Sequence, residues 1–313
     1  MATVIVFGPT GNIGSVAART AQENGAKVVL AMRDTKKKIP GLSEEEESKG
    51  GYQRVTADVT KPDTVAEAIK STGATRAFMY IAFGTSDHMK ATFQSLKDSG
   101  IEFVVFLSSS TIQIEKSDIP QKEIISWFHA QAELSLDAVY GEENYVAVRP
   151  GRFITNLVQY KQGINDGEVK MFGSNMKMDS TTPTDMGRVS GSILAAGQSK
   201  DGQRKVYVYG PQIKSMGETI KAVGKALGKD VKTTEISAEE GLQQSIAHGT
   251  PPPIAKYIND LLSSGPDADQ ELGEKGEERE LYKTGVKNIE LYSGKKATSI
   301  EEWVKANKSV FEV

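Results

Sequence analysis

The chain of 313 residues contains no cysteine and only three histidines. Without cysteine it cannot form disulfides, thiolate metal ligands or a cysteine nucleophile. His88, His129 and His248 are too far apart in the sequence to show metal-ligand spacing, so we predict no metal site. The serines at 108–110 have no histidine and aspartate at a local spacing that would indicate a hydrolase.

The chain also lacks an excess of charge of one sign and lacks long apolar runs. The 38 basic and 41 acidic residues leave a net charge of −3, which argues against a nucleic-acid-binding surface built on bulk charge. No apolar run approaches the roughly 18 residues of a membrane span, and the N-terminal segment lacks the pattern of a signal peptide. We therefore expect a soluble, cytoplasmic protein with neither a nucleic-acid nor a membrane partner.

The most informative segment is Val4–Gly14, in which an apolar strand runs into G-x-x-G-x-x-G and then into a helix predicted over Ser15–Asn24. Gly8 allows a sharp turn, Gly11 lets backbone approach a pyrophosphate, and Gly14 lets the helix pack closely on a sheet. The N–H groups at such a helix start, together with the helix dipole, attract an anion. The segment therefore predicts a dinucleotide site, with further contacts expected from Thr10, Asn12 and Ile13.

Apolar segments and helical segments alternate through the first half of the chain. Strands are predicted at 27–32, 52–56, 77–82, 103–107 and 145–148, and helices at 60–69 (with a capping box at Thr60–Asp63), 89–99 and 124–138. Near-continuous apolar strands separated by helices indicate a parallel sheet covered on both faces. The predicted fold is α/β, a Rossmann-type doubly wound parallel sheet.

The second half is predicted to be a smaller, helix-rich region. It contains a strand at 205–209, capping boxes that begin at Ser215, Ser237 and Ser299, a proline run at 251–253 before a short helix at 254–262, and a polar segment at 264–280 predicted as a mobile loop. We predict a dinucleotide-binding Rossmann domain at 1–157, to which segments around 180–210 return. The remainder, 158–313, is predicted to be mainly a substrate-binding or lid region with lid residues Tyr257, Leu261 and Leu262.

The end of the second predicted strand bears on which dinucleotide binds. An acidic residue at this place contacts the ribose hydroxyls of NAD. In this chain the first residue after the strand is Arg33, whose guanidinium can bind a 2′-phosphate with two hydrogen bonds. Lys37, within the run Lys36–Lys38, can add positive charge. The pattern favours NADP(H) over NAD. NAD stays an alternative because Asp34 can contact ribose hydroxyls, and the lysines can equally form a solvated loop.

Other strand ends carry further candidate contacts. Asp58 and Val59 follow the third strand and can meet the adenine edge, although Asp58 can equally cap the local turn. The segment Ala82-Phe83-Gly84-Thr85, after the fourth strand, contains small residues where the backbone is expected to pass near the adenosine ribose. At the nicotinamide end, contacts are predicted from Ser109, Pro150 and Phe153.

Together these residues resemble the NmrA-like and isoflavone-reductase-like branch of the atypical short-chain dehydrogenase/reductase superfamily. The resemblance extends over nearly the whole chain. It implies a Rossmann domain, a small discontinuous substrate domain, NADP(H) bound across the sheet edge and a small-molecule substrate. The motifs that carry it are Gly8–Gly14, Arg33, Phe106–Ser110, Val148–Gly151 with Phe153 and Asn156, Thr184–Gly187 and the helix around Trp303.

The chain departs from this family in its proton donors. Classical members use Tyr-x-x-x-Lys, and the one occurrence here, Tyr292 to Lys296, lies far past the fifth strand and is interpreted as chance. Isoflavone-reductase-like enzymes place a lysine in the helix after the fifth strand, where we align Gln131. His129 is a candidate acid or orienting group, although a structural helix histidine is an alternative. The candidate catalytic residues are His129, Gln131 and Ser109.

Two functions fit this pattern. The first is an NADP(H)-dependent reductase of a small organic molecule with a polarised C=N, C=C or C=O bond, in specialised metabolism. A cationic iminium would need no proton donor, because hydride transfer neutralises it. The second is a non-catalytic, NmrA-type dinucleotide sensor that acts through a protein partner, a reading supported by the missing donors.

Overall fold

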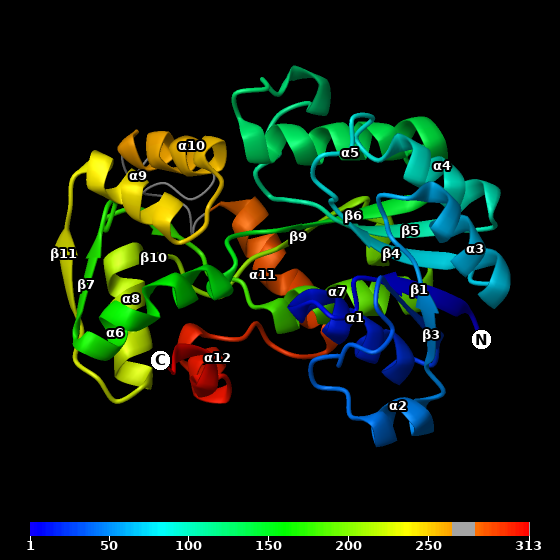
Figure 1. Cartoon of the computed structure of the whole chain (residues 1–313), viewed down its shortest axis with the longest axis horizontal. Helices are drawn as coiled ribbons and strands as arrows, with labels where there is room; N and C mark the ends of the chain where they lie inside the picture. The colour runs from blue at the N-terminus through cyan, green and yellow to red at the C-terminus, as the bar shows by residue number, and fades with distance from the viewer. Residues whose placement is uncertain (265–278, 313) are drawn as a thin grey trace.

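A computed structural model describes residues 1–264 and 279–312. Figure 1 shows a parallel sheet sandwiched between helices, with a second, smaller region beside it. Apart from its ends, the loop predicted at 264–280 lies outside the described residues, and Glu280 already begins a helix. Within the described ranges, no helix has both the length and the apolar character needed to cross a membrane.

The main sheet has seven parallel strands in the order β3-β2-β1-β4-β5-β6-β9, with the crossover between the two halves at β1 and β4. This arrangement confirms the predicted Rossmann-type doubly wound fold. The strands are β1 (Thr3–Phe7), β2 (Lys27–Met32), β3 (Gln53–Thr56), β4 (Arg76–Tyr80), β5 (Phe103–Leu107), β6 (Tyr145–Pro150) and β9 (Lys205–Val208).

Apolar residues on both faces of the strands hold the layers together. In β1, Val4 and Val6 pack into the core on one face, while Ile5 and Phe7 pack into the core on the other. This double burial explains why the central strands are apolar with little polar alternation, whereas the edge strand β3 contains Gln53, Arg54 and Thr56 and has no buried residue.

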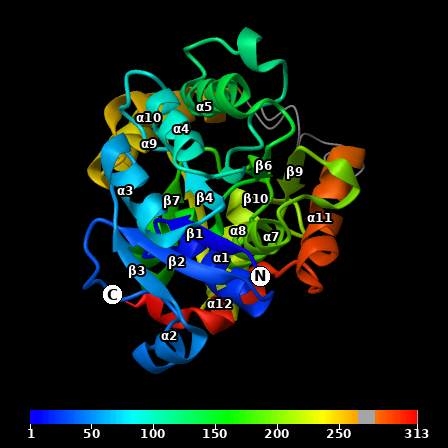
Figure 2. The same cartoon turned by 90° about the vertical axis from the view of Figure 1, so that its right-hand side faces the viewer.

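Helices cover both faces of the sheet, as Figures 1 and 2 show. Those on the first face are α1 (Asn12–Glu23), α7 (Pro183–Ala196) and α11 (Glu280–Ser293). Those on the second face are α3 (Pro62–Thr72), α4 (Lys90–Asp98) and α5 (Ile124–Tyr140). Close packing of α7 on α1 depends on Gly187, where a Cβ would lie 2.5 Å from the Val16 Cβ. The short helix α2 (Glu44–Gly50) joins β2 to β3.

The C-terminal region forms its own core around Met216, Ile220 and Trp303. Two small sheets belong to it, one pairing β7 with β11 and the other pairing β8 with β10. Its elements are η2 (Ile154–Tyr160), α6 (Lys161–Asp166), β7 (Glu168–Met171), β8 (Lys177–Met178), β10 (Lys214–Ser215), α8 (Met216–Ala226), β11 (Lys232–Glu235), α9 (Ala238–Ala247), α10 (Pro252–Ser263) and α12 (Ile300–Ala306).

Most of the predicted helix caps are confirmed. Ser215, Ser237 and Ser299 each form a complete capping box with the glutamate three residues later. The box predicted at Thr60–Asp63 is wrong. Helix α3 is preceded by Lys61 with no side-chain cap, and the Thr60 hydroxyl instead bonds Asp58.

Candidate functional site

The glycine turn joins β1 to α1 at the carboxyl edge of the sheet. Gly8 has a left-handed φ of 69°, and Gly14 packs so closely that a Cβ there would lie 2.3 Å from the Gly8 carbonyl oxygen. The helix begins at Asn12, earlier than the predicted Ser15, and its N-cap Gly11 supplies no side-chain cap. Its first N–H groups are therefore available to an anion. The turn residues that are exposed or partly exposed are Gly8, Thr10, Gly11, Asn12 and Ile13.

At the end of β2, the two residues that bear on cofactor choice, Arg33 and Asp34, differ in whether their side chains already form hydrogen bonds. Arg33 is exposed, with neither a hydrogen bond nor an ion pair to any residue that the structure describes. Asp34 is committed to its own turn, because Oδ1 accepts the Lys36 N–H at 3.0 Å and the carbonyl accepts the Lys37 N–H at 3.3 Å. The guanidinium, which suits a phosphate, is thus the free group of the two.

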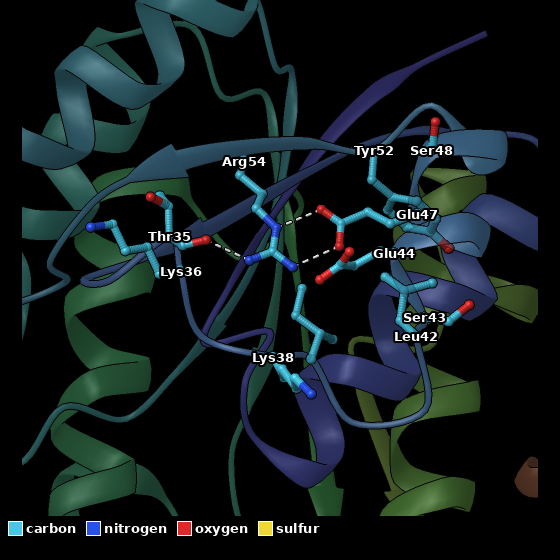
Figure 3. Close-up of a pocket in the computed structure, with 11 residues that line it drawn as sticks. Thr35, Lys36, Lys38, Leu42, Ser43, Glu44, Glu47, Ser48, Tyr52 and Arg54 are labelled. Atoms are coloured by element: carbon cyan, nitrogen blue, oxygen red, sulfur yellow. Dashed lines mark hydrogen bonds and ion pairs between the residues drawn. The ribbon is translucent and has the colours of Figure 1, made fainter.

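Arg54 of β3 holds the loop that follows Arg33, a role that the sequence analysis missed. Its guanidinium donates to both Glu47 oxygens, at 2.5 and 2.7 Å, and to the carbonyls of Thr35 and Lys37. Arg54, Glu47 and Thr35 line a cavity between the loop and α2, with a volume of about 760 Å³. Figure 3 shows the bonds of Arg54 to Glu47 and Thr35 there. The Lys37 backbone is anchored while its side chain stays exposed.

Asp58, after β3, caps the local turn, which is the alternative that the sequence left open. Its Oδ1 accepts the N–H and the hydroxyl of Thr60 at 3.0 and 2.8 Å. These bonds, with a contribution from Arg33, hold the pKa of Asp58 below its ordinary value. Burial raises the pKa of Tyr80, on which Arg33 and Asp58 both act. The ends of β2, β3 and β4 therefore meet beside the glycine turn, with Val59 buried behind them.

The loop after β4 presents an aromatic surface against α5. Phe83 is 54% exposed, and its ring centroid lies 5.5 Å from that of Phe128 and 6.1 Å from that of His129. His88 lies 5.0 Å from Trp127 in an edge-on contact and has a left-handed φ of 52°, which is uncommon outside glycine. The sequence predicts a contact at Phe83 but gives no local signal for this cluster, because its rings come from two segments far apart in the chain.

The remaining predicted contacts lie along the same edge of the sheet. Ala82 and Ser109 are partly exposed in the loops after β4 and β5, and the Ser109 hydroxyl is 2.9 Å from that of Thr111. Pro150 ends β6 and is buried, while Phe153 is partly buried three residues further on. Together with the glycine turn, these residues follow the carboxyl ends of neighbouring strands at one edge of the sheet, and their contacts with a dinucleotide stay predictions.

The two candidate catalytic residues of α5 are not brought together. His129 and Gln131 are two positions apart, or about 200° around a helix, so they face different ways. His129 is buried, and its Nδ1 donates to the Ile125 carbonyl at 2.8 Å. Burial lowers the pKa of His129, so its imidazole is neutral at pH 7. Gln131 is partly exposed.

The buried His129 should make stability depend on pH. In the unfolded chain it would bind a proton below its ordinary pKa of 6.5, whereas the folded state resists protonation because burial lowers that pKa. Stability is therefore expected to fall as pH drops below about 6.5 toward the folded pKa. Urea titrations at pH 7.5 and 5.5 should show a smaller loss for His129→Gln than for the unmodified chain. The exposed His248 provides the control, because His248→Gln should leave the pH dependence unchanged.

A buried ionic network ties α5 to the sheet below this edge. Arg149 of β6 donates to both oxygens of Glu133, at 3.0 and 2.6 Å, and also to the Ile112 carbonyl and the Tyr207 hydroxyl. Ser108 donates to the same carboxylate at 2.5 Å. Burial disfavours the charge of the Arg149 guanidinium, but the ion pair with Glu133 outweighs this effect and raises the pKa of Arg149. Arg149 thus anchors α5 to the edge of the sheet.

The chance Tyr-x-x-x-Lys pair lies in and just after α11. Tyr292 is buried, and its hydroxyl accepts the Lys200 N–H at 3.1 Å. Lys296 is exposed beyond the end of α11. The tyrosine therefore packs on the face of the sheet and does not reach the edge that carries the glycine turn.

The predicted lid residues Tyr257, Leu261 and Leu262 all lie on α10. This helix packs against α9 and α5, beside the end of α5 in Figure 1. Leu262 packs into the C-terminal core, whereas Leu261 is 38% exposed. The C-terminal region thus borders α5, the helix that carries Trp127 and Phe128 of the aromatic cluster.

Comparisons with known proteins agree with this architecture. The model of the NmrA-like family matches residues 1–304. The nitrogen metabolite regulation-like protein bik4 of Gibberella fujikuroi is 32% identical, over 96% of this chain and 95% of that protein. An NAD(P)H azoreductase of Xenophilus azovorans is 25% identical over 98% of this chain and 99% of that enzyme. The solved NADPH complex of an Escherichia coli NADPH-dependent quinone oxidoreductase has a TM-score of 0.70 at 17% identity, covering 97% of this chain and 99% of that one. From the glycine turn to the helix of Trp303, the chain is a member of the NmrA-like family.

Proposed function

We propose that this protein is an NADP(H)-dependent reductase of a small organic molecule with a polarised C=N, C=C or C=O bond, serving specialised metabolism without a Tyr-x-x-x-Lys proton donor. The observation that carries the proposal is the free Arg33 guanidinium beside the uncapped start of α1. A dinucleotide with an additional phosphate is the ligand that uses both features. The azoreductase and quinone oxidoreductase relatives support the same reaction type.

The residues present fit an NADP(H) cofactor. The N–H groups at Asn12 and Ile13 would hold the pyrophosphate, and Arg33 would hold the 2′-phosphate. Any side chain at Gly14 would collide with the turn, so the helix can start close to a bound phosphate only with glycine there. When bound, NADPH supplies a hydride.

On the substrate side, the chain's own residues position the substrate and exclude water. Phe83 and Phe128 offer an apolar wall at the edge of the sheet, next to α10. His129 is neutral and buried, which suits a hydrogen-bonding or orienting role better than delivery of a proton at pH 7. A substrate that is already electrophilic, such as an iminium ion, needs little more than this.

The test is to measure NADPH oxidation across a panel of iminium ions, enones, quinones and aldehydes, with NADPH and NADP+ affinities measured in parallel. Turnover of at least one class, faster with NADPH than with NADH, is the expected result. Cofactor binding without oxidation across the whole panel would reject the reductase.

The second candidate is a dinucleotide sensor that acts through a protein partner, and it is favoured by the relative named for nitrogen metabolite regulation. A sensor should discriminate between dinucleotides without consuming them. Similar affinities for NADPH and NADP+ and an absence of turnover would support this candidate over the reductase.

A further inference from the structure

Arg152 lies just beyond β6, at the carboxyl edge where open α/β sheets bind their ligands. Its backbone is fixed on both sides. The N–H donates to Asp179 Oδ1 at 3.0 Å, and the carbonyl accepts the Thr181 N–H at 2.7 Å. The position of the residue is therefore set independently of what its side chain binds.

The Arg152 guanidinium lacks an oxygen partner among the described residues. Its hydrogen-bond contact is to the Met178 sulfur, a weak acceptor, although arginine offers five N–H donors. No carboxylate of a described residue forms an ion pair with it. Burial lowers the pKa of Arg152, with Tyr160 and Asp179 acting in the opposite direction. Arg152 is partly exposed, so an anion that arrives from solvent can meet a guanidinium whose one acceptor among the described residues is weak.

Asp179 does not fill this role, because its oxygens accept hydrogen bonds from two backbone N–H groups and from the Thr181 hydroxyl. It is fully buried, and its Oδ2 accepts the Thr181 hydroxyl at 2.5 Å and the Gly210 N–H at 2.8 Å. Gly151 presses on the carboxylate so closely that a Cβ would lie 2.3 Å from Oδ1. Asp179 thus holds the chain that carries Arg152 and acts on its guanidinium only electrostatically, because no hydrogen bond or ion pair joins the two groups in the described part of the chain.

The contrast with Arg149, three residues earlier, is informative. Arg149 is buried and is satisfied by both oxygens of Glu133, by a carbonyl and by the Tyr207 hydroxyl. The same stretch of chain thus contains one arginine whose partners are complete and one whose partners are missing. Tyr160, at the end of η2, lies near Arg152. Burial raises the pKa of Tyr160, and the positive charge of Arg152 acts against that rise. Its neutral phenol can donate to the same acceptor as Arg152.

We propose that Arg152, assisted by Tyr160, binds a carboxylate on the substrate. This inference rests on the proposed function, since it assigns part of the substrate of that reductase. A planar carboxylate matches the fork of a guanidinium and would supply the oxygens that Met178 cannot. The substrate is then an organic acid whose reducible bond lies toward the cofactor, with the carboxylate turned toward the C-terminal region.

The test uses benzoate and its neutral counterpart benzamide as probes, with binding to the NADP+-loaded protein measured by calorimetry. Benzoate should bind about tenfold more tightly than benzamide to the unmodified chain, as charge-assisted hydrogen bonds imply. Arg152→Gln should abolish this preference, and Arg152→Lys should keep part of it. Equal binding of the two probes, or no benzoate binding, would overturn the proposal.

A matched control and a second measurement separate this inference from the proposed function. Arg204→Gln removes a guanidinium that bonds the Glu143 carbonyl at the opposite end of β9 and should leave both probes unaffected. Arg152→Gln should leave NADPH affinity unchanged, whereas a loss would place Arg152 at the cofactor and refute the carboxylate site. A benzoate preference without turnover of any substrate would reject the reductase and leave the anion site standing.

Discussion

Replacing Arg33 with alanine is expected to weaken NADPH binding about 10- to 100-fold, the range for hydrogen bonds to a charged group. NADH binding should change little, because NADH lacks the 2′-phosphate that the guanidinium would hold. Arg33 has no described partner to lose, so the substitution should leave the fold intact. Fluorescence titration of the two reduced cofactors measures both affinities.

Two companion variants sharpen this experiment. Arg33→Lys keeps the charge but loses the planar fork, so its NADPH affinity should lie between those of alanine and arginine. Asp34→Ala removes a side chain that is engaged in its own turn and should affect the two cofactors alike. An equal loss of NADPH and NADH affinity in Arg33→Ala would show that the cofactor assignment is wrong.

Breaking the buried pair of Glu133 and Arg149 is expected to cause the largest loss of stability. Glu133→Gln leaves a guanidinium uncompensated in the interior, which costs about 3–5 kcal/mol of unfolding free energy. The pair is nearly inaccessible to solvent, with side chains 0% and 2% exposed, so water cannot replace the missing charge. Urea unfolding followed by circular dichroism measures the loss.

The double variant Glu133→Leu with Arg149→Met removes both charges and should recover much of that stability, since apolar replacement of a whole buried pair is often neutral. As a surface control, Lys49→Ala breaks an exposed i,i+4 pair with Glu45 and should cost at most about 1 kcal/mol. A Glu133→Gln protein as stable as the Lys49→Ala protein would mean that the network contributes little.

Local sequence was sufficient for the sheet, the glycine turn and most of the caps. The central strands are buried on both faces, so they stand out as continuous apolar segments. A serine followed by a glutamate three residues later predicts a capping box, as at Ser299, because both bonding partners lie within one helical turn. The box at Thr60–Asp63 was wrong because Asp58, just outside the window, competed for the Thr60 hydroxyl.

The sequence did not predict the C-terminal strands β7, β8, β10 and β11. They are short, and they pair across long stretches of sequence, as β11 does with β7. Isolated segments of two to four residues carry too little periodicity to stand out.

By itself the sequence determined the Rossmann-type sheet, the turn from Gly8 to Gly14 and the position of Arg33 at a strand end, because each depends on residues that are neighbours in the chain. Tertiary structure alone decided which polar groups are occupied. It buried His129, paired Arg149 with Glu133, and left the guanidinium groups of Arg33 and Arg152 without a hydrogen bond or ion pair to any carboxylate of the described residues. The physical reason is that a charge is satisfied or left open by groups from distant strands and helices, which meet only in the folded molecule.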